Sequence, residues 1–153
     1  MASSKIPPVH FHFPRPFSLS GRKGLKNFIA GIFRSEKVRL GSVHYIFCTD
    51  EFLLEMNNQY LGHNYFTDII TFNLAEKGDS VAGEIYISVD RVVENARDLR
   101  LTLKEEMLRV IFHGVLHLCG YGDKTKAQEK EMRAREDYYL KKYAKVLSSR
   151  RGR

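Results

Sequence analysis

Two histidines, a glycine and an aspartate follow one another at short intervals in the stretch FHGVLHLCGYGD, residues 112–123. His113 and His117 are four residues apart, so on a helix their side chains lie roughly 40° apart on one face and one turn from each other. Gly120 allows the left-handed backbone conformation that ends a helix, and Asp123 follows three residues later on the returning chain. Two imidazoles and one carboxylate suit Zn²⁺, and three protein ligands leave one tetrahedral position open for chemistry. We therefore expect one zinc ion, or another divalent metal, held by His113, His117 and Asp123.

Each of these residue types also has a purely structural explanation. A histidine pair on an apolar helix can belong to the core, a glycine can simply end the helix, and Asp123 can cap the helix that follows. The combined spacing favours the metal site.

Metzincin peptidases share this spacing in the pattern H-E-x-x-H-x-x-G-x-x-H, where the glutamate is the general base. Here Gly114 replaces that glutamate, so a peptidase lacks its local base, and the glycine instead permits close packing of the helix.

Basic side chains are concentrated near the C-terminal end of the sequence. The formal net charge is +7, and residues 124–153 contain 11 basic and 4 acidic side chains, whereas residues 1–123 contain 14 of each. A solvated C-terminal helix with a basic tail would explain this distribution. A surface for a polyanion such as RNA would explain it as well.

Length and composition indicate one reduced, water-soluble domain over residues 1–153. A domain of this size buries roughly 68–70% of its unfolded surface, so it needs neither a metal nor a disulfide merely to fold. Its two cysteines, Cys48 and Cys119, stand in apolar settings, and the first ten residues lack the features of a secretory signal. No apolar run reaches the 18 or so residues that span a bilayer. We expect a cytoplasmic protein without membrane association.

The elements that must position these residues can be read from the hydrophobic pattern. Alternating or β-branched segments predict strands in the first half of the chain, within residues 9–13, 42–48, 67–74 and 83–89, and the last two could form a hairpin. Helical patterns cover residues 25–33, 49–62, 90–99, 102–120 and 127–147. Thr49 or Asp50 and then Gly62 bound the second helix, and Thr102 with Glu105 forms a capping box ahead of the histidine helix. This order predicts an α+β fold, a small four-stranded sheet covered by helices, with the metal-binding helix in the C-terminal half.

Three segments resemble the YbeY endoribonucleases, metal-dependent RNases of ribosomal RNA maturation. The family motif H-G-x-L-H-L-x-G-Y-x-H appears as HGVLHLCGYGD, and N-x-x-Y-R-x-x-D-x-P-T-D-V-L-S-F is similar to NNQYLGHNYFTDIITF, residues 57–72. AGEIYIS, residues 82–88, resembles the family strand L-G-D-I-x-I-S. The resemblance covers roughly residues 40–140.

The departures from the family pattern concern the site itself. Asp123 stands where the family has its third metal-binding histidine, and a carboxylate also binds zinc. Leu61 stands in place of an arginine that we assign to phosphate binding, and a leucine cannot make that contact. Another cation, on the basic C-terminal helix, would have to replace it.

The resemblance implies a zinc-dependent, single-strand-specific endoribonuclease. Its expected roles are processing of the 3′ end of small-subunit ribosomal RNA and ribosome quality control, with the small ribosomal subunit as partner and no DNA specificity. Asp68, which matches the family T-D, is the expected catalytic base or orienting residue, although it could instead cap a turn. The nucleophile is water or the ribose 2′-hydroxyl. Two alternatives stay open: a ribosome-assembly RNA-binding factor with weak catalysis and a structural metal, and a metallohydrolase or peptidase with another substrate.

Overall fold

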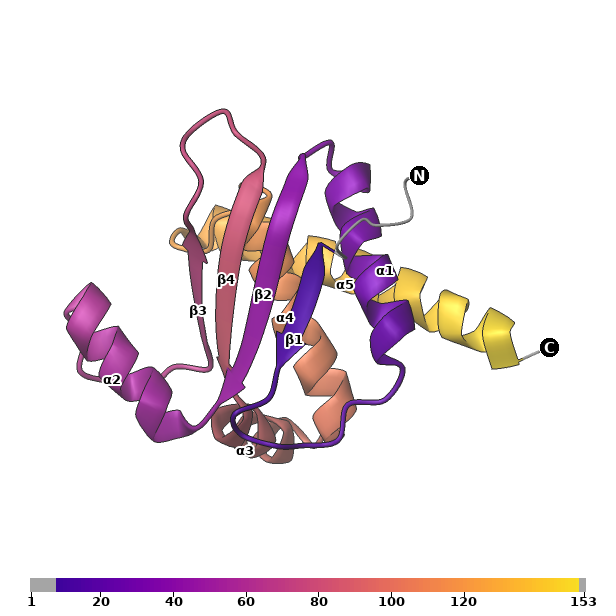
Figure 1. The fold of residues 1–153 in the computed structure, drawn as a ribbon. Coiled ribbons are helices and arrows are strands. Elements are labelled where there is room, and N and C mark those ends of the chain that lie inside the picture. The colour runs from indigo at the N-terminus through magenta and orange to yellow at the C-terminus, as the bar shows by residue number, and fades with distance from the viewer. Residues whose placement is uncertain (1–7, 152–153) are drawn as a thin grey trace.

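A four-stranded sheet forms the centre of the computed structural model, which describes residues 8–151 (Figure 1). Its strands, in the spatial order β1-β2-β4-β3, are β1 (Val9–His12), β2 (Leu40–Cys48), β4 (Val81–Ser88) and β3 (Ile69–Asn73). The pairs β1 with β2 and β2 with β4 are parallel, and β3 runs antiparallel to β4. The four predicted strands and the predicted hairpin are confirmed.

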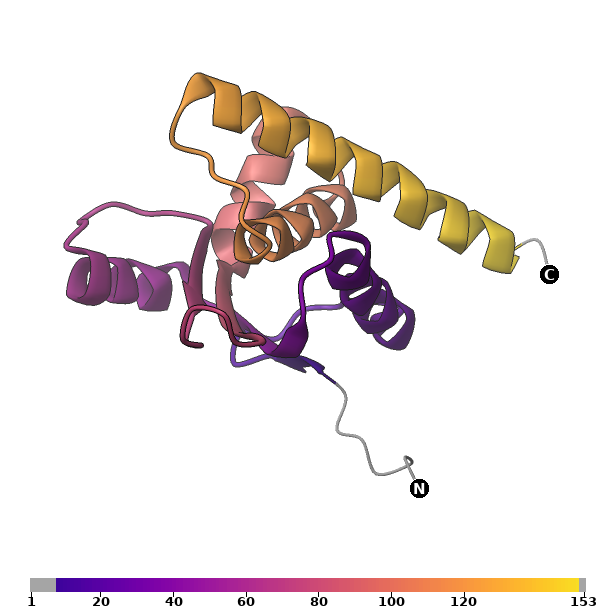
Figure 2. The same cartoon turned by 90° about the horizontal axis from the view of Figure 1, so that it is seen from above.

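Five helices accompany the sheet in the described part of the chain. They are α1 (Arg22–Ser35), α2 (Asp50–Leu61), α3 (Val89–Leu99), α4 (Leu103–Leu118) and α5 (Lys126–Arg151). Figure 2 shows α1, α4 and α5 on one side of the sheet, with α5 as the outermost layer. Within residues 8–151, no helix combines the length and the apolar character needed to cross a membrane.

Helices α2 and α4 are capped at the residues that the sequence indicated. The Thr49 side chain accepts a hydrogen bond from the backbone of Phe52, and Gly62 ends α2 in the left-handed conformation at φ +69°. At the start of α4, Thr102 and Glu105 exchange the two hydrogen bonds of a capping box. These caps satisfy backbone groups that a helix end leaves unpaired, so they fix where α2 and α4 begin.

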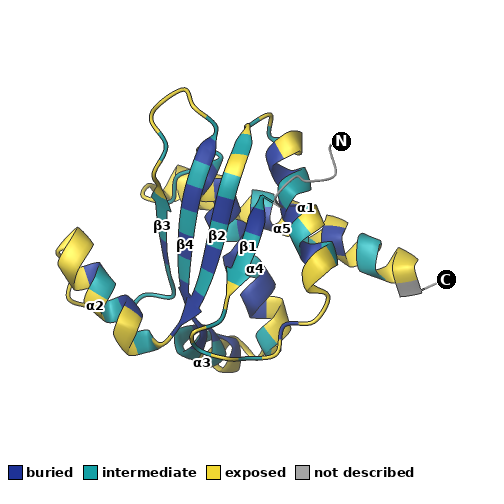
Figure 3. Cartoon of the chain, viewed as in Figure 1, coloured by how far each residue is buried: buried dark blue, intermediate teal, exposed yellow. Residues whose placement is uncertain are grey.

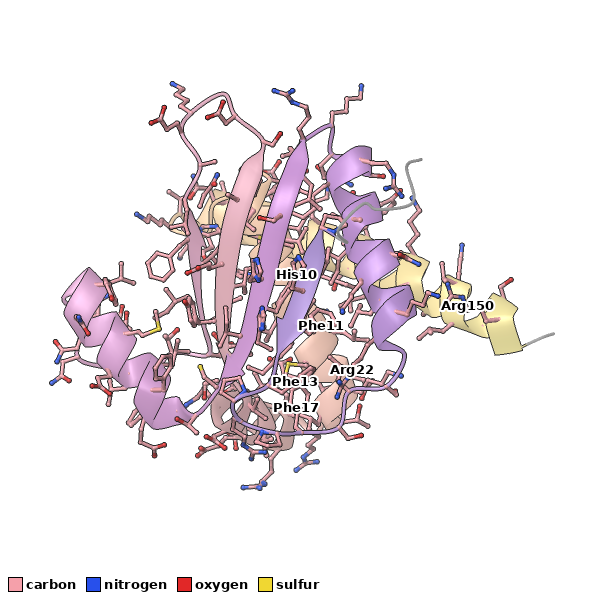
Figure 4. All side chains as sticks on the ribbon, in the orientation of Figure 1. His10, Phe11, Phe13, Phe17, Arg22 and Arg150 are labelled. Atoms are coloured by element: carbon pink, nitrogen blue, oxygen red, sulfur yellow. The ribbon has the colours of Figure 1, made fainter. Side chains whose placement is uncertain are left out.

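The main core lies between the sheet and the helices on its covered face (Figure 3). Figure 4 shows Phe11, Phe13 and Phe17 gathered near the end of β1, where all three rings pack against Phe47. In the middle of the core, the Tyr45 hydroxyl donates a hydrogen bond of 2.9 Å to the carbonyl of Ile111. This bond ties the sheet to α4 two residues before His113.

Gly114 lets α4 lie directly on the sheet. A Cβ atom at this position would come within 2.9 Å of Ile85 Cδ1 and within 3.1 Å of Ile69 Cδ1. Because real Cβ atoms almost never approach other atoms so closely, a larger residue would push the helix away from β3 and β4. The predicted close packing at Gly114 is therefore confirmed.

Three histidines form a ladder on the opposite face of the sheet. His10 and His44 are partners across β1 and β2, and their ring centroids are 4.4 Å apart. The ring of His12 stacks on that of His44 at 5.1 Å, and a contact of 2.9 Å joins His12 Nε2 to His44 Nδ1. Burial and the charges of these neighbours lower the pKa of His10.

Candidate metal and catalytic site

His113 and Asp123 face each other across the turn that follows α4. The distance from His113 Nε2 to Asp123 Oδ2 is 3.3 Å. Two ligands of one tetrahedral zinc ion, each at about 2.0–2.1 Å from the metal, would also be separated by roughly 3.3 Å. The structure therefore brings these two expected ligands to the spacing that a shared ion requires.

Hydrogen bonds on the other ring nitrogens direct both histidines. His113 Nδ1 donates to the Glu136 carboxylate at 2.7 Å, and His117 Nδ1 donates to the backbone carbonyl of Tyr121 at 2.8 Å. A carboxylate and a carbonyl can only accept, so the proton of each neutral ring lies on Nδ1 and the lone pair on Nε2. Metal-binding histidines are commonly oriented by such partners.

His117 lies farther from the pair than a bound metal would place it. The ring centroids of His113 and His117 are 6.2 Å apart with nearly parallel planes, whereas two imidazoles on one tetrahedral zinc would place them roughly 5 Å apart. Within residues 8–151, no group of three His, Cys, Asp or Glu side chains is arranged so that it could hold a metal ion. The assignment of His117 as the third ligand thus stays a prediction.

The chemistry of the donors nevertheless fits a divalent metal. When the His113 ring is neutral, the lone pair of Nε2 faces a carboxylate oxygen only 3.3 Å away. A cation between the two atoms, either a proton on Nε2 or a metal ion, removes the repulsion. His117 is exposed, and its imidazole would add a second nitrogen donor to a set of two imidazoles and one carboxylate, which suits zinc.

The loop that carries Asp123 is anchored at both ends. Gly120 turns the chain out of α4 at φ +107°, a conformation that favours glycine. The Tyr121 hydroxyl donates a hydrogen bond of 2.8 Å to the largely buried carboxylate of Glu36, the residue that follows α1. At the start of α5, Thr125 accepts a hydrogen bond from the backbone of Gln128, whose side chain accepts one from the backbone of Thr125 in return. The position of Asp123 is therefore fixed by neighbours on three elements.

Two adjoining pockets, each of about 320 Å³, meet at His113 and Asp123. The first is lined by Thr67, Asp68, Ile69, Glu106, Arg109, Val110, His113, Asp123, Arg133 and Glu136. The second is lined by His113, Asp123, Glu129, Met132, Arg133 and Glu136. His117 lines neither pocket.

Asp68 enters the first pocket from the residue that precedes β3. Its side chain makes no hydrogen bond to another residue in the described part of the chain, so the turn-capping alternative finds no support there. Burial raises the pKa of Asp68, and the charge of His113 opposes that rise. The structure thus brings together Asp68, which directly precedes β3, His113 on α4, and Asp123 in the loop before α5.

Glu136 and Arg109 complete the site, and neither residue was predicted from the sequence. Glu136 is buried on α5, where one carboxylate oxygen accepts from His113 and the other accepts from Arg109 at 2.8 Å. A second bond of 2.6 Å joins Arg109 to Asp137. Burial lowers the pKa of His113, but the hydrogen bond and charge of Glu136 outweigh that effect, and the net direction is upward.

Arg133 is the cation on α5 that reaches both pockets. Its side chain is exposed, and no carboxylate lies within ion-pair distance of it among residues 8–151. Leu61 is an exposed residue at the end of α2 and lines neither pocket. Of the aromatic residues near the site, Phe66 is exposed beneath the Arg91 guanidinium, 4.9 Å from its ring centroid.

This chain is similar to known proteins over most of its length. The family model described as "Endoribonuclease YbeY" matches residues 20–144. The protein named Endoribonuclease YbeY from Flavobacterium psychrophilum is 44% identical over 133 residues, which cover 87% of this chain and 94% of that protein. Its namesake from Cytophaga hutchinsonii is 45% identical over 124 residues, covering 81% and 87%. A solution structure of a Thermotoga maritima protein superposes with a TM-score of 0.63 at 30% identity, covering 93% of both chains.

Proposed function

Since the chain belongs to the YbeY endoribonuclease family, we propose that it is a metal-dependent endoribonuclease that cleaves single-stranded regions of ribosomal RNA. Its expected place is the cytoplasm, where it would process the 3′ end of small-subunit ribosomal RNA and act in ribosome quality control. The small ribosomal subunit is the partner that this role implies.

The observation that supports this function best is the position of His113 and Asp123 where two open pockets meet. A metal held there by His113, His117 and Asp123 would have space beside it for a phosphodiester and a nucleophile. An assembly factor with a purely structural metal would instead be expected to close the remaining position with a protein side chain. Zinc is the expected ion, and another divalent transition metal would suit the same ligands.

When bound, the metal would supply Lewis-acid polarisation of a phosphate oxygen and a stronger nucleophile at neutral pH. The chain's own residues do the positioning. Glu136 holds the His113 ring through Nδ1, so Nε2 stays directed toward Asp123. Asp68, on the wall of the same pocket, accepts the proton of the attacking water or ribose 2′-hydroxyl, or orients that group. Its raised pKa brings it closer to the value that suits a general base near neutral pH.

Arg133 is the residue that we expect to contact the phosphate. Leu61 cannot do so, whereas Arg133 lies beside His113 and Asp123 and has no carboxylate partner among the described residues. A guanidinium binds phosphate through paired hydrogen bonds. Farther along α5, exposed lysines including Lys141, Lys142 and Lys145 extend the positive surface for the RNA backbone.

A peptidase is the weaker alternative for physical reasons. At Gly114, even a Cβ atom would meet Ile85 and Ile69 at 2.9–3.1 Å, so the position cannot carry an acidic general base. The site also contains a cation, Arg133, that suits a phosphate better than a peptide.

Incubation with a structured RNA that carries a single-stranded tail tests the proposed function. The metal-replete protein should cleave within the tail, leave the duplex intact, and lose activity when a chelator is added. A DNA of the same sequence measures the expected lack of DNA specificity. Cleavage of the duplex and the tail at equal rates, or full activity of the metal-free protein, would contradict the proposal.

A further inference from the structure

Glu106 is a buried carboxylate without a partner in the first pocket. The residue is 6% exposed, and its Oε1 atom is fully buried with no hydrogen-bond partner among residues 8–151. An ionised carboxylate in this state costs several kcal/mol of desolvation. Unpaired buried polar groups are rare in folded proteins, and a bound ion is one of the usual reasons for them.

The other carboxylates of this pocket are already engaged, with one exception. Glu136 is paired with Arg109 and His113, and Asp123 faces His113. Asp68 is the exception, since its carboxylate makes no hydrogen bond to another residue in the described part of the chain. Asp68 and Glu106 line the same pocket, and Asp68 is close enough to raise the pKa of Glu106 further, after burial.

The charge of the pocket conflicts with an anionic substrate. Four carboxylates line it, Asp68, Glu106, Asp123 and Glu136, against two guanidinium groups, Arg109 and Arg133. With all four carboxylates ionised, one divalent ion at His113 and Asp123 would only balance this excess, before the phosphodiester adds its own negative charge. This step rests on the proposed function, because only an anionic substrate makes the remaining negative charge an obstacle.

We propose that Asp68 and Glu106 hold a second, hard divalent cation of the Mg²⁺ class, apart from the metal expected at His113, His117 and Asp123. Mg²⁺ commonly binds to one or two carboxylates and completes its octahedral shell with water and substrate phosphate oxygens. Two protein ligands therefore suffice, so the absence of a three-residue metal cluster within residues 8–151 does not conflict with this site. An imidazole-free pair of carboxylates also discriminates against zinc.

Such an ion would attract the phosphodiester into the pocket that Arg133 also lines. Asp68 can bind the cation through one oxygen and keep the other for the proton of the nucleophile. Glu106, on the turn of α4 before Arg109, would act through the ion alone.

Titration of the zinc-loaded protein with Mn²⁺, followed by electron paramagnetic resonance, tests this site in the absence of RNA. The wild type should bind one equivalent of Mn²⁺ beyond its zinc, and Mg²⁺ should displace it. Glu106→Gln and Asp68→Asn should each weaken Mn²⁺ binding at least about tenfold, the lower end of what losing even an outer-shell partner costs a metal site. Both substitutions keep the shape of the side chain and remove its charge.

Glu131→Gln is the matched control, because Glu131 is exposed on α5 and lines neither pocket. It removes the same charge and should leave Mn²⁺ binding unchanged. Circular dichroism and zinc content establish that each variant is folded. The site is overturned if the zinc-loaded wild type binds no Mn²⁺, or if both pocket variants bind it as tightly as the control.

RNA cleavage separates this inference from the proposed function. If the zinc-loaded wild type binds Mn²⁺ through Glu106 but cleaves no RNA, the cation site stands and the endoribonuclease proposal fails. If it cleaves RNA at the same rate with and without Mg²⁺, and Mn²⁺ does not bind, the endoribonuclease proposal stands and the cation site fails.

Discussion

Replacing Gly114 by alanine tests the close approach of α4 to the sheet. The added Cβ would lie 2.9 Å and 3.0 Å from the Cδ1 and Cγ2 atoms of Ile85, a fully buried residue, and 3.1 Å from Ile69 Cδ1. Overpacking of this kind costs about 1–3 kcal/mol, and alanine recovers about 0.5–1 kcal/mol because it is the better helix former. The net loss should reach up to about 2.5 kcal/mol, which lowers Tm by up to about 10 °C for a chain of this size.

Gly31 in α1 supplies the matched control for thermal unfolding. A Cβ there would meet only Arg34 Nη2, at 3.5 Å, so Gly31→Ala should raise stability by about 0.5–1 kcal/mol through helix propensity alone. Ile85→Val removes the closest methyl group and should partly relieve the Gly114→Ala defect. The double variant should therefore lose less stability than the sum of the losses in the two single variants. If Gly114→Ala raises Tm as Gly31→Ala does, the contact with the sheet does not limit this position.

Three further predictions concern the phosphate, the metal and the histidine ladder. Arg133→Ala should raise KM for RNA roughly 10- to 150-fold, as expected for losing a hydrogen bond to a charged group of about 1.5–3 kcal/mol. It should also lower the slope of log Kd against log salt by about 0.7, while Lys130→Ala leaves KM unchanged. During dialysis against a competing chelator, Asp123→Ala should lose its zinc, whereas the wild type and Asp123→His should keep theirs. Equal zinc retention in all three proteins would show that Asp123 is not a metal ligand. Since the pKa of His10 is lowered by burial and by neighbouring imidazoles, the unfolded chain binds the proton first and stability falls as pH drops below about 6.5. The fall in Tm between pH 7 and pH 5 should therefore be smaller in His10→Gln than in wild type or in the matched variant His63→Gln, and an equal fall in all three would contradict this assignment.

Local signals in the sequence predicted the elements well because each depends on a few neighbouring residues. The Thr102 and Glu105 capping box and the turn at Gly120 act within four residues, so their positions could be read directly. The family motif likewise placed His113 and Asp123 together, and their contact at 3.3 Å is in the structure.

Residues that reach the site from a distant segment could not be predicted in the same way. Glu136 lies 23 positions after His113, and only the packing of α5 across α4 brings the two together. The charged pattern of α5 does not reveal which face is buried, so Glu136 and Arg133 looked like any other solvated residues. Glu106 could not be distinguished from the sequence either, because it is next to the capping-box residue Glu105 and acidic residues are common in the first turn of a helix.

Single-turnover cleavage of the tailed RNA by the zinc-replete wild type and by His113→Ala tests whether RNA is cleaved at His113. His113 lines both pockets and pairs with Asp123 and Glu136, so we expect the wild type to cleave within the single-stranded tail. The folded variant should cleave at least about a thousandfold more slowly, the scale of the loss when a central catalytic group is removed. A His113→Ala protein that cleaves the same tail at the wild-type rate would show that the reaction does not take place at this site.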